Sequence, residues 1–444
     1  MNENPSFPYV SHKDLEKTVH EALLSEKFWA WLLIAATIAM AAYWVRYFGP
    51  VMPYWGAGIF LFVIWFQGSS LDIPEGTLIE KVDPEKLGKY TAEQIHAIVR
   101  EISESFWEKE IPNVYFVEET SEAMAAVVNV DILNFVKRWN AIYIGPYLLH
   151  TLEEDELKAV LSHEMCHFSL HYTFWMRYFY LKIVIFAVWI TVAISYLYHW
   201  TSGWFAGQNW IVKLILAYVV LKLGQFMLNI ATGIIVVWTD RADSQEVEAL
   251  CDYEAAKRYG LLPTVNVLLK TGTRQEIFTA LLAQFSPDDV RPIEGLVEAT
   301  AHEAETANTE ERQQIISNQA EAMQAAYMKL NEILPYEFLT LEEATPYIDE
   351  AVRTGLDDSE AQRYKHASKQ MLRWLEHDTN IANQQLDRVE YATFIQELEN
   401  NPDKPLFYIS EEMDEELAAE AEHPTFRNRI LFLEYNKDSL AQGM

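Results

Sequence analysis

The stretch Leu161-Ser-His-Glu-Met-Cys-His-Phe168 contains the motif HExxH, with His163, Glu164 and His167 at its fixed positions. Two histidines four residues apart lie one above the other on a helix, so both imidazoles can reach one ion. The glutamate beside the first histidine is placed to take a proton from a water that the ion activates. Two histidines and a carboxylate leave one tetrahedral position of zinc open, as catalytic zinc sites do. The motif therefore predicts one Zn²⁺ per chain, with Glu164 as the catalytic base.

Chance alone is a weak explanation for this motif. The chain has 12 histidines in 444 residues, and a random HExxH is then expected in roughly 3% of such chains. Thr151 followed by Glu154 is a capping-box pattern, which predicts that a helix begins there. No glycine or proline interrupts the chain from that point to Ser202. We therefore expect this helix to contain the motif and to continue into the apolar stretch that follows.

Four apolar stretches distinguish the chain from an ordinary soluble protein: residues 28–45, 54–67, 178–198 and about 210–238. A helix needs roughly 20 apolar residues to cross the hydrocarbon of a bilayer, and the first, third and fourth stretches reach that length. Tryptophan and tyrosine gather at the ends of these stretches, as they do at membrane interfaces. The pattern favours about four transmembrane helices in two hairpins. The alternative is a set of buried helices in a large soluble core.

The order of the stretches predicts seven parts: an N-terminal tail (1–27), a first transmembrane hairpin (28–67), an α+β catalytic region (68–172), a second transmembrane hairpin (173–238), a helix with the third zinc ligand (239–262), an acidic helical insertion (263–420) and a C-terminal segment that completes the catalytic domain (421–444). Within the catalytic region, apolar periodicity predicts a helix over 92–106 and strands at 113–117 and 140–144. The expected fold class is mainly α and integral to a membrane, with a small α+β catalytic domain.

The third zinc ligand is expected just after the second hairpin, because that hairpin returns the chain to the same face of the membrane. The third apolar stretch begins roughly three helical turns after His167, and Glu248 follows the end of the fourth by a similar interval. Both would stand about 15–16 Å from the membrane if those intervals are helical. Glu248 is the expected ligand, although spacing alone leaves Glu246 and Glu254 as alternatives. Asp252, one turn further on, is expected to accept a hydrogen bond from the first histidine of the motif.

HExxH leading into a transmembrane hairpin, followed by ExxxD at Glu248 and Asp252, resembles the membrane zinc metallopeptidases of the HtpX and CAAX prenyl protease family. The order of the elements resembles the HtpX branch in particular. A further family motif, HPxxxxRI, is matched by the stretch from His423 to Ile430. The resemblance implies a zincin-type catalytic domain, in which His423 stabilises the oxyanion and Arg429 braces the active site.

The chain departs from this family's usual pattern close to the expected site: at Met165-Cys166 between the histidines, at Cys251 before the aspartate, and at Glu122-Ala-Met-Ala125, where the family has an Asn-Ala-Phe-Ala strand beside the substrate cleft. Substrate can still dock as an added strand, since that needs mainly backbone groups. The two cysteines cannot form the disulfide framework of a secreted protein. We expect them to be buried packing residues, with a redox or alternative-ligand role as the less favoured interpretation.

Charge is concentrated in one region of the chain. Of the formal net charge of −31, residues 271–420 contribute −21, from 11 basic and 32 acidic side chains. A balance this acidic argues against nucleic acid as a partner, because phosphate binding needs lysine and arginine. It also has the wrong sign for docking on anionic lipid heads. We expect the insertion to be a solvated helical region without chemistry. The alternative is a lid or adaptor that controls access to the zinc.

Basic residues favour one orientation in the membrane. Lys13, Lys17 and Lys27 lie in the N-terminal tail, whereas the loops 46–53 and 201–209 share a single basic residue. By the positive-inside tendency, the tail and the active site face the cytoplasm. The expected location is therefore a cell (inner) membrane, which the chain crosses several times.

Together these features predict a membrane-embedded zinc metalloendopeptidase that hydrolyses membrane or membrane-proximal proteins, and the resemblance implies a role in protein quality control. The competing enzyme interpretation is processing of one defined precursor, such as a lipidated protein, for which more membrane spans would be expected. The non-enzyme alternative is a membrane scaffold that keeps zinc for structure, which the open ligand set disfavours. The expected partners are protein substrates and the lipid bilayer; the sequence does not specify the oligomeric state.

Overall fold

The computed structural model describes residues 8–48, 76–106, 111–117, 123–129, 138–169, 245–282, 373–379, 384–402 and 424–441, with single positions in 185–192, 336–343 and 404–407. These residues form a mostly helical fold with one four-stranded sheet. The sheet and most of the helices share one hydrophobic core.

The sheet has the strand order β1-β2-β4-β3. The short strand β1 (Thr77–Leu78) is antiparallel to β2 (Asn113–Phe116), and β2 is parallel to β4 (Arg138–Ile144). The strand β3 (Ala123–Asn129) pairs antiparallel with β4 along its whole length. The strands expected at 113–117 and 140–144 are confirmed as β2 and β4. Within the described sheet, β3 forms one edge.

One face of the sheet and one face of helix α3 (Ala92–Ser105) contribute to the main core. From the strands, Val114, Ile142 and Ile144 are fully buried. From α3, the buried side chains follow the spacing of a helical stripe: Ile95, Ile98, Val99 and Ile102. Thr91 and Gln94 form a capping box at the start of the helix. The helix expected over 92–106 is therefore confirmed.

Helix α5 (Glu154–Ser169) contains the HExxH motif and lies against α3 and β3. Its first turn is capped differently from the expectation. The backbone N–H of Glu153 donates to Glu156 at 2.9 Å, whereas the Thr151 hydroxyl donates to the carbonyl of Tyr336 at 3.0 Å. The predicted capping box of Thr151 and Glu154 is wrong, because Thr151 is the last residue of the preceding helix α4 (Pro146–Thr151). The expected continuation of α5 beyond Ser169 lies outside the described residues.

Helices α9 (Gln245–Tyr259) and α10 (Leu261–Leu282) contact α5 and each other. A buried ion pair joins α10 to α5, since the Lys270 ammonium lies 2.9 Å and 2.8 Å from the two carboxylate oxygens of Glu156. The C-terminal helices α18 (Phe426–Tyr435) and α19 (Lys437–Ala441) also contact α9. Because α9 has neighbours on several sides, residues 247–253 of this helix are all buried.

Parts of the expected acidic insertion belong to the same core. Helix α10, the short helix η5 (Trp374–His377) and helix α15 (Arg388–Asn400) all bury apolar side chains there. The Asn266 side chain exchanges two hydrogen bonds with the backbone of Leu386, at 2.9 Å and 3.4 Å. Gly272 allows the ring of Phe407 to lie against α10, because a Cβ at that position would overlap the ring. At these positions the acidic region is a structural part of the domain.

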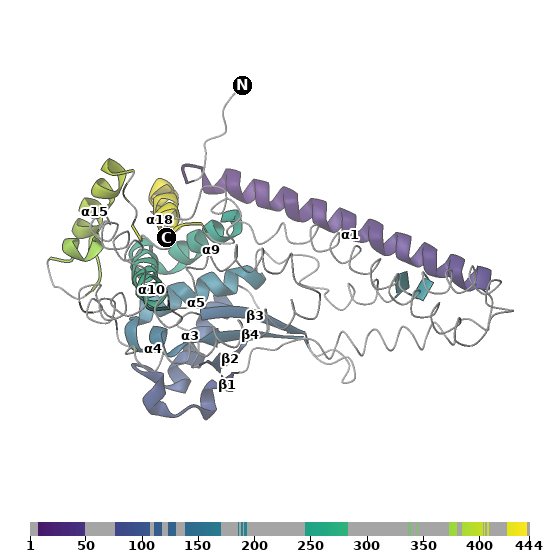
Figure 1. Ribbon diagram of the computed structural model, residues 1–444, viewed down its shortest axis with the longest axis horizontal. Coiled ribbons are helices and arrows are strands. Elements are labelled where there is room, and N and C mark those ends of the chain that lie inside the picture. The colour runs from purple at the N-terminus through teal and green to yellow at the C-terminus, as the bar shows by residue number, and fades with distance from the viewer. Residues whose placement is uncertain are drawn as a thin grey trace, which may run out of the picture.

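Helix α1 (His12–Phe48) extends away from the sheet and the other labelled helices as one long rod (Figure 1). It begins within the expected N-terminal tail, because Leu15, Val19 and Leu23 form a stripe that is buried in the main core. Residues 12–47 form the one helix, within the described ranges, that is long and apolar enough to cross a membrane. The other expected spans, apart from a few positions between 185 and 192, fall on residues that the structure does not describe.

Candidate metal centre

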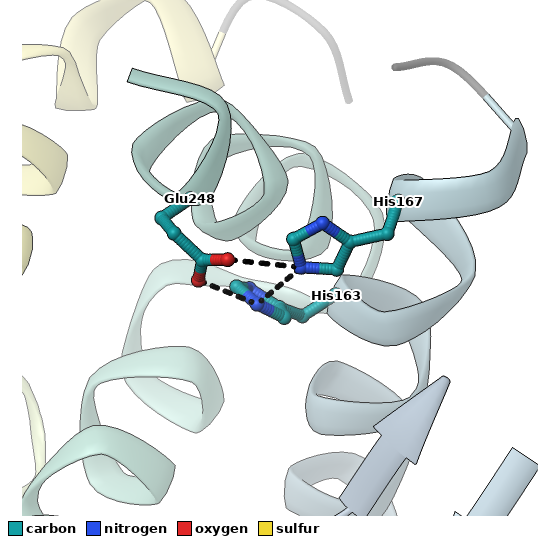
Figure 2. Close-up of side chains that lie close together, drawn as sticks. All are labelled: His163, His167 and Glu248. Carbon is teal, nitrogen blue, oxygen red and sulfur yellow. Dashed lines mark hydrogen bonds and ion pairs between the residues drawn. The ribbon is translucent and has the colours of Figure 1, made fainter. Parts of the chain in front are cut away.

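Three side chains from two helices meet at one point (Figure 2). His163 and His167 lie one turn apart on α5, and Glu248 faces them from α9. The two Nε2 atoms are 3.2 Å apart, and each lies 3.3 Å from one carboxylate oxygen of Glu248. The side chains of His163 and Glu248 are nearly buried, whereas that of His167 is 25% exposed. His167 is therefore the member of the group that is most accessible to solvent.

The spacing of these atoms fits a single metal ion. All the ligand atoms of His163, His167 and Glu248 lie within 4.8 Å of one another. Zinc binds imidazole and carboxylate at about 2.0–2.1 Å, so two ligands of a tetrahedral zinc lie roughly 3.3 Å apart. The observed separations of 3.2 Å and 3.3 Å match this value. Two nitrogens and one carboxylate are also the donor set that catalytic zinc sites use.

A carboxylate on α9 holds the first histidine in place. Asp252 Oδ1 lies 2.8 Å from Nδ1 of His163, so Nδ1 is the protonated nitrogen and Nε2 is left to face Glu248 and His167. Arg429, from α18, donates to both oxygens of Asp252, at 2.6 Å and 2.7 Å. The guanidinium and carboxylate form a two-point pair, which fixes the orientation of Asp252. Asp252 and Arg429 thus lie behind His163, and their expected role in supporting a metal site stays a prediction.

The electrostatics of this chain of contacts follow from burial and pairing. Burial raises the pKa of Asp252, but Arg429 and His163 lower it, and the net effect is a pKa below the ordinary value. Burial lowers the pKa of His163, but the carboxylates of Asp252 and Glu248 raise it well above its usual range. A metal ion is a cation and opposes protonation of its histidine ligands. The dense negative charge around His163 therefore favours a bound cation as well as a proton.

The structure also describes the proposed catalytic base, Glu164, and the alternative third ligands, Glu246 and Glu254. Glu164 is partly exposed on α5 beside His163. Burial lowers the pKa of Arg429, but Asp252, Glu248 and Glu164 raise it, so Glu164 lies within electrostatic reach of the same centre. Glu254 pairs with Lys257 and Arg258. Among the described residues, the group of possible metal ligands contains Glu248 and neither of the alternatives, Glu246 and Glu254.

Two further expectations concern residues near the centre. Cys166 and Cys251 are buried thiols that form no disulfide, in keeping with the expected packing role. His423, the expected oxyanion donor, lies outside the described residues. The sequence interpretation missed the support behind α9, where the imidazole of His12 stacks on the ring of Tyr253. No local pattern could have revealed that contact, because its partners are far apart in the sequence.

One protein family has a model that matches the part of the chain containing this centre. Residues 90–249 match the model of Peptidase family M48. The M48 match covers somewhat more than a third of the chain and runs from just before α3 into α9, so it includes both motif histidines and the facing glutamate. No curated protein and no solved structure gives a significant match to the chain. The M48 match supports a metallopeptidase and does not distinguish the HtpX branch.

Proposed function

We propose that this chain is a zinc metalloendopeptidase that hydrolyses membrane or membrane-proximal proteins. The convergence of His163, His167 and Glu248 carries this proposal, because the three side chains come from two helices and present their ligand atoms to one point. The M48 match over the same elements supports peptide hydrolysis as the reaction. The alternative of a zinc scaffold is less well supported, since Glu164 lies beside an open three-ligand site.

Each residue of the centre has a proposed role in the reaction. His163, His167 and Glu248 would hold the zinc, which supplies Lewis-acid activation of the scissile carbonyl and of a water. Glu164 accepts the proton of the attacking water and delivers it to the leaving amine. Asp252, fixed by Arg429, keeps Nε2 of His163 unprotonated and directed at the site. By resemblance, His423 supports the developing oxyanion.

The sheet offers a place for the substrate backbone. The strand β3 is an edge strand of the described sheet and lies against α5, the helix that contains the HExxH motif. An extended peptide can add to such an edge through backbone hydrogen bonds. We propose that the substrate docks along β3, which would bring its backbone close to His163 and Glu164.

Helix α1 supports a membrane location. From Phe28 onward it exposes large apolar side chains that water would not favour, including Phe28 at 63%, Trp31 at 62% and Ile38 at 65% exposed. We propose that the chain crosses the membrane several times, as the HtpX resemblance implies, with the metal centre on the cytoplasmic side of a cell (inner) membrane. Protein quality control is the proposed biological role.

A matched pair of proteins tests the proposed reaction. Purified wild type and Glu164→Gln are expected to hold one zinc per chain each, because Glu164 is not a ligand. Only the wild type should cleave an unfolded casein-like protein or itself. Equal cleavage by both proteins would remove Glu164 from its role. Normal zinc content with no cleavage of unfolded or membrane substrates by the wild type would favour the scaffold alternative.

A further inference from the structure

Helix α1 runs without a break from the core around the metal centre, which we call the metal domain, into the first apolar stretch of the chain (residues 28–45). It contains 37 residues from His12 to Phe48, and no glycine or proline occurs among them. Leu15, Val19 and Leu23 are buried in the main core, and the exposed aromatic side chains of the helix begin at Phe28. The distance between two residues of a continuous helix follows from the number of residues between them, since each residue adds about 1.5 Å along the axis.

The first residues of α1 are anchored close to the metal centre. The imidazole of His12 stacks on Tyr253, with ring centroids 4.3 Å apart and planes inclined by 12°. The backbone N–H of His12 donates to Asn436 at 2.8 Å, and the hydroxyl of Tyr253 donates to Ser439 at 3.1 Å. Tyr253 follows Asp252, which contacts His163 directly. The start of α1 is therefore linked to His163 through two neighbouring residues of α9, Tyr253 and Asp252.

The second half of α1 is attached to the chain that follows the HExxH helix. Ala30 packs with Ile185, and the indole N–H of Trp189 donates to the Thr37 hydroxyl at 2.9 Å. The order of these contacts is the same in both segments, so the two run in the same direction away from the metal domain. Helix α1 is therefore held at two places: at its start, by the helices around the metal centre, and in its apolar part from Phe28 onward, by Ile185 and Trp189. We call this helix the strut.

The strut has a definite length. From His12 to Phe28 the helix rises about 24 Å, which places the metal centre on the order of 20 Å from the start of the apolar half. An extended chain advances about 3.3 Å per residue, so roughly six residues are needed to cover that distance. We infer that α1 sets the height of the metal centre above the bilayer, and that membrane-anchored substrates are cleaved only at bonds about six or more residues from the membrane edge. The inference rests on the proposed function.

A series of anchored substrates tests the height. Each substrate has one membrane span, an uncleavable Gly/Ser/Pro spacer, one short cleavable segment and a folded reporter. The spacers range from about 2 to about 12 residues, so that they lie on both sides of the expected minimum. Full-length wild type is reconstituted with each substrate in vesicles, with Glu164→Gln as the control for contaminating proteases. The same cleavable segment without an anchor serves as the reference, and mass spectrometry locates each cut.

The expected result is full cleavage with the longest spacers and at least a tenfold loss with the shortest one. The unanchored segment should be cut by the wild type alone. Equal rates with the shortest and the longest spacers, together with cleavage of the unanchored segment, would overturn the height restriction and leave the peptidase function intact. Failure to cut the unanchored segment by a zinc-loaded wild type would instead overturn the proposed function, and the restriction with it.

Discussion

The carboxylate of Asp252 lies 2.8 Å from Nδ1 of His163, and Asp252 is only 1% exposed. A buried anion at this distance holds the imidazole as one tautomer, so that Nε2 is available for a metal. The contact joins α9 to α5, which are the two helices that contribute the possible ligands. Much of the behaviour expected of the centre follows from this one contact.

Replacing Asp252 should weaken zinc binding without removing a ligand. In Asp252→Asn the side chain keeps its shape but loses the charge that orients His163 and pairs with Arg429. Zinc affinity is expected to fall by about 10- to 100-fold, as it does when such partners are removed. Competition with a chelator of known affinity measures the change. Asp155→Asn is the control, because Asp155 is exposed in the first turn of α5, and this variant should bind zinc as the wild type does. An unchanged zinc affinity in Asp252→Asn would contradict the role assigned to Asp252.

Removing Arg429 should destabilise the protein as well as the centre. In Arg429→Ala the carboxylate of Asp252 remains buried and keeps only His163 as a partner. The loss of one member of a buried ion pair costs about 3–5 kcal/mol, so a large drop in Tm is expected in the metal-free protein. Arg388→Ala is the matched control, because Arg388 is exposed on α15. The prediction fails if the two variants have nearly the same Tm.

The pair of Glu156 and Lys270 gives a test that is remote from the metal. Lys270→Met leaves the Glu156 carboxylate buried without its cation and should cost about 3–5 kcal/mol. The double variant Glu156→Gln with Lys270→Met should recover most of that loss, because neither position of the pair is then charged. Urea denaturation of both variants measures the difference. If the double variant is as unstable as the single one, the ion pair is not the source of the effect.

The same pair predicts a dependence on pH. Burial raises the pKa of Glu156, although Lys270 opposes the shift. The folded state then binds the proton more tightly than the unfolded state, so stability is greatest below the ordinary glutamate pKa and declines as pH rises through the folded value. Without Lys270 the pKa of Glu156 in the folded state should rise further. The stability deficit of Lys270→Met relative to wild type should therefore shrink as the pH is lowered toward the ordinary glutamate pKa, and a deficit that widens on acidification would contradict the assignment.

The sequence predicts those elements whose signals are local. The apolar stripe of α3, the short strands β2 and β4, and the HExxH helix all follow from residues within one element. Glu248 could also be predicted as the ligand candidate, because the expected second hairpin would return the chain to the side of the HExxH helix. The role of Arg429 was expected from the family resemblance alone, because its partner Asp252 lies 177 positions away in the sequence.

Other features could not be foreseen from local patterns. Leu15, Val19 and Leu23 are spaced by four residues among charged neighbours, which is typical of a solvated tail as much as of a core stripe. The acidic composition of 271–420 hides the apolar faces of α15 and η5, which contact each other, and Trp374 of η5 donates to Thr273 of α10. Thr151 has the residue type of a helix cap, yet a distant carbonyl at Tyr336 takes its hydroxyl.

The composition of the metal centre can be measured directly. Elemental analysis of the purified, membrane-reconstituted protein is expected to give one zinc per chain. X-ray absorption at the zinc edge is expected to reveal two imidazole nitrogens and carboxylate or water oxygens at about 2.0–2.1 Å. Glu248→Ala should lose most of the zinc, whereas Glu246→Ala should retain it. A sulfur shell from Cys166 or Cys251, or zinc retained by Glu248→Ala and lost from Glu246→Ala, would contradict the assignment of His163, His167 and Glu248 as the metal centre.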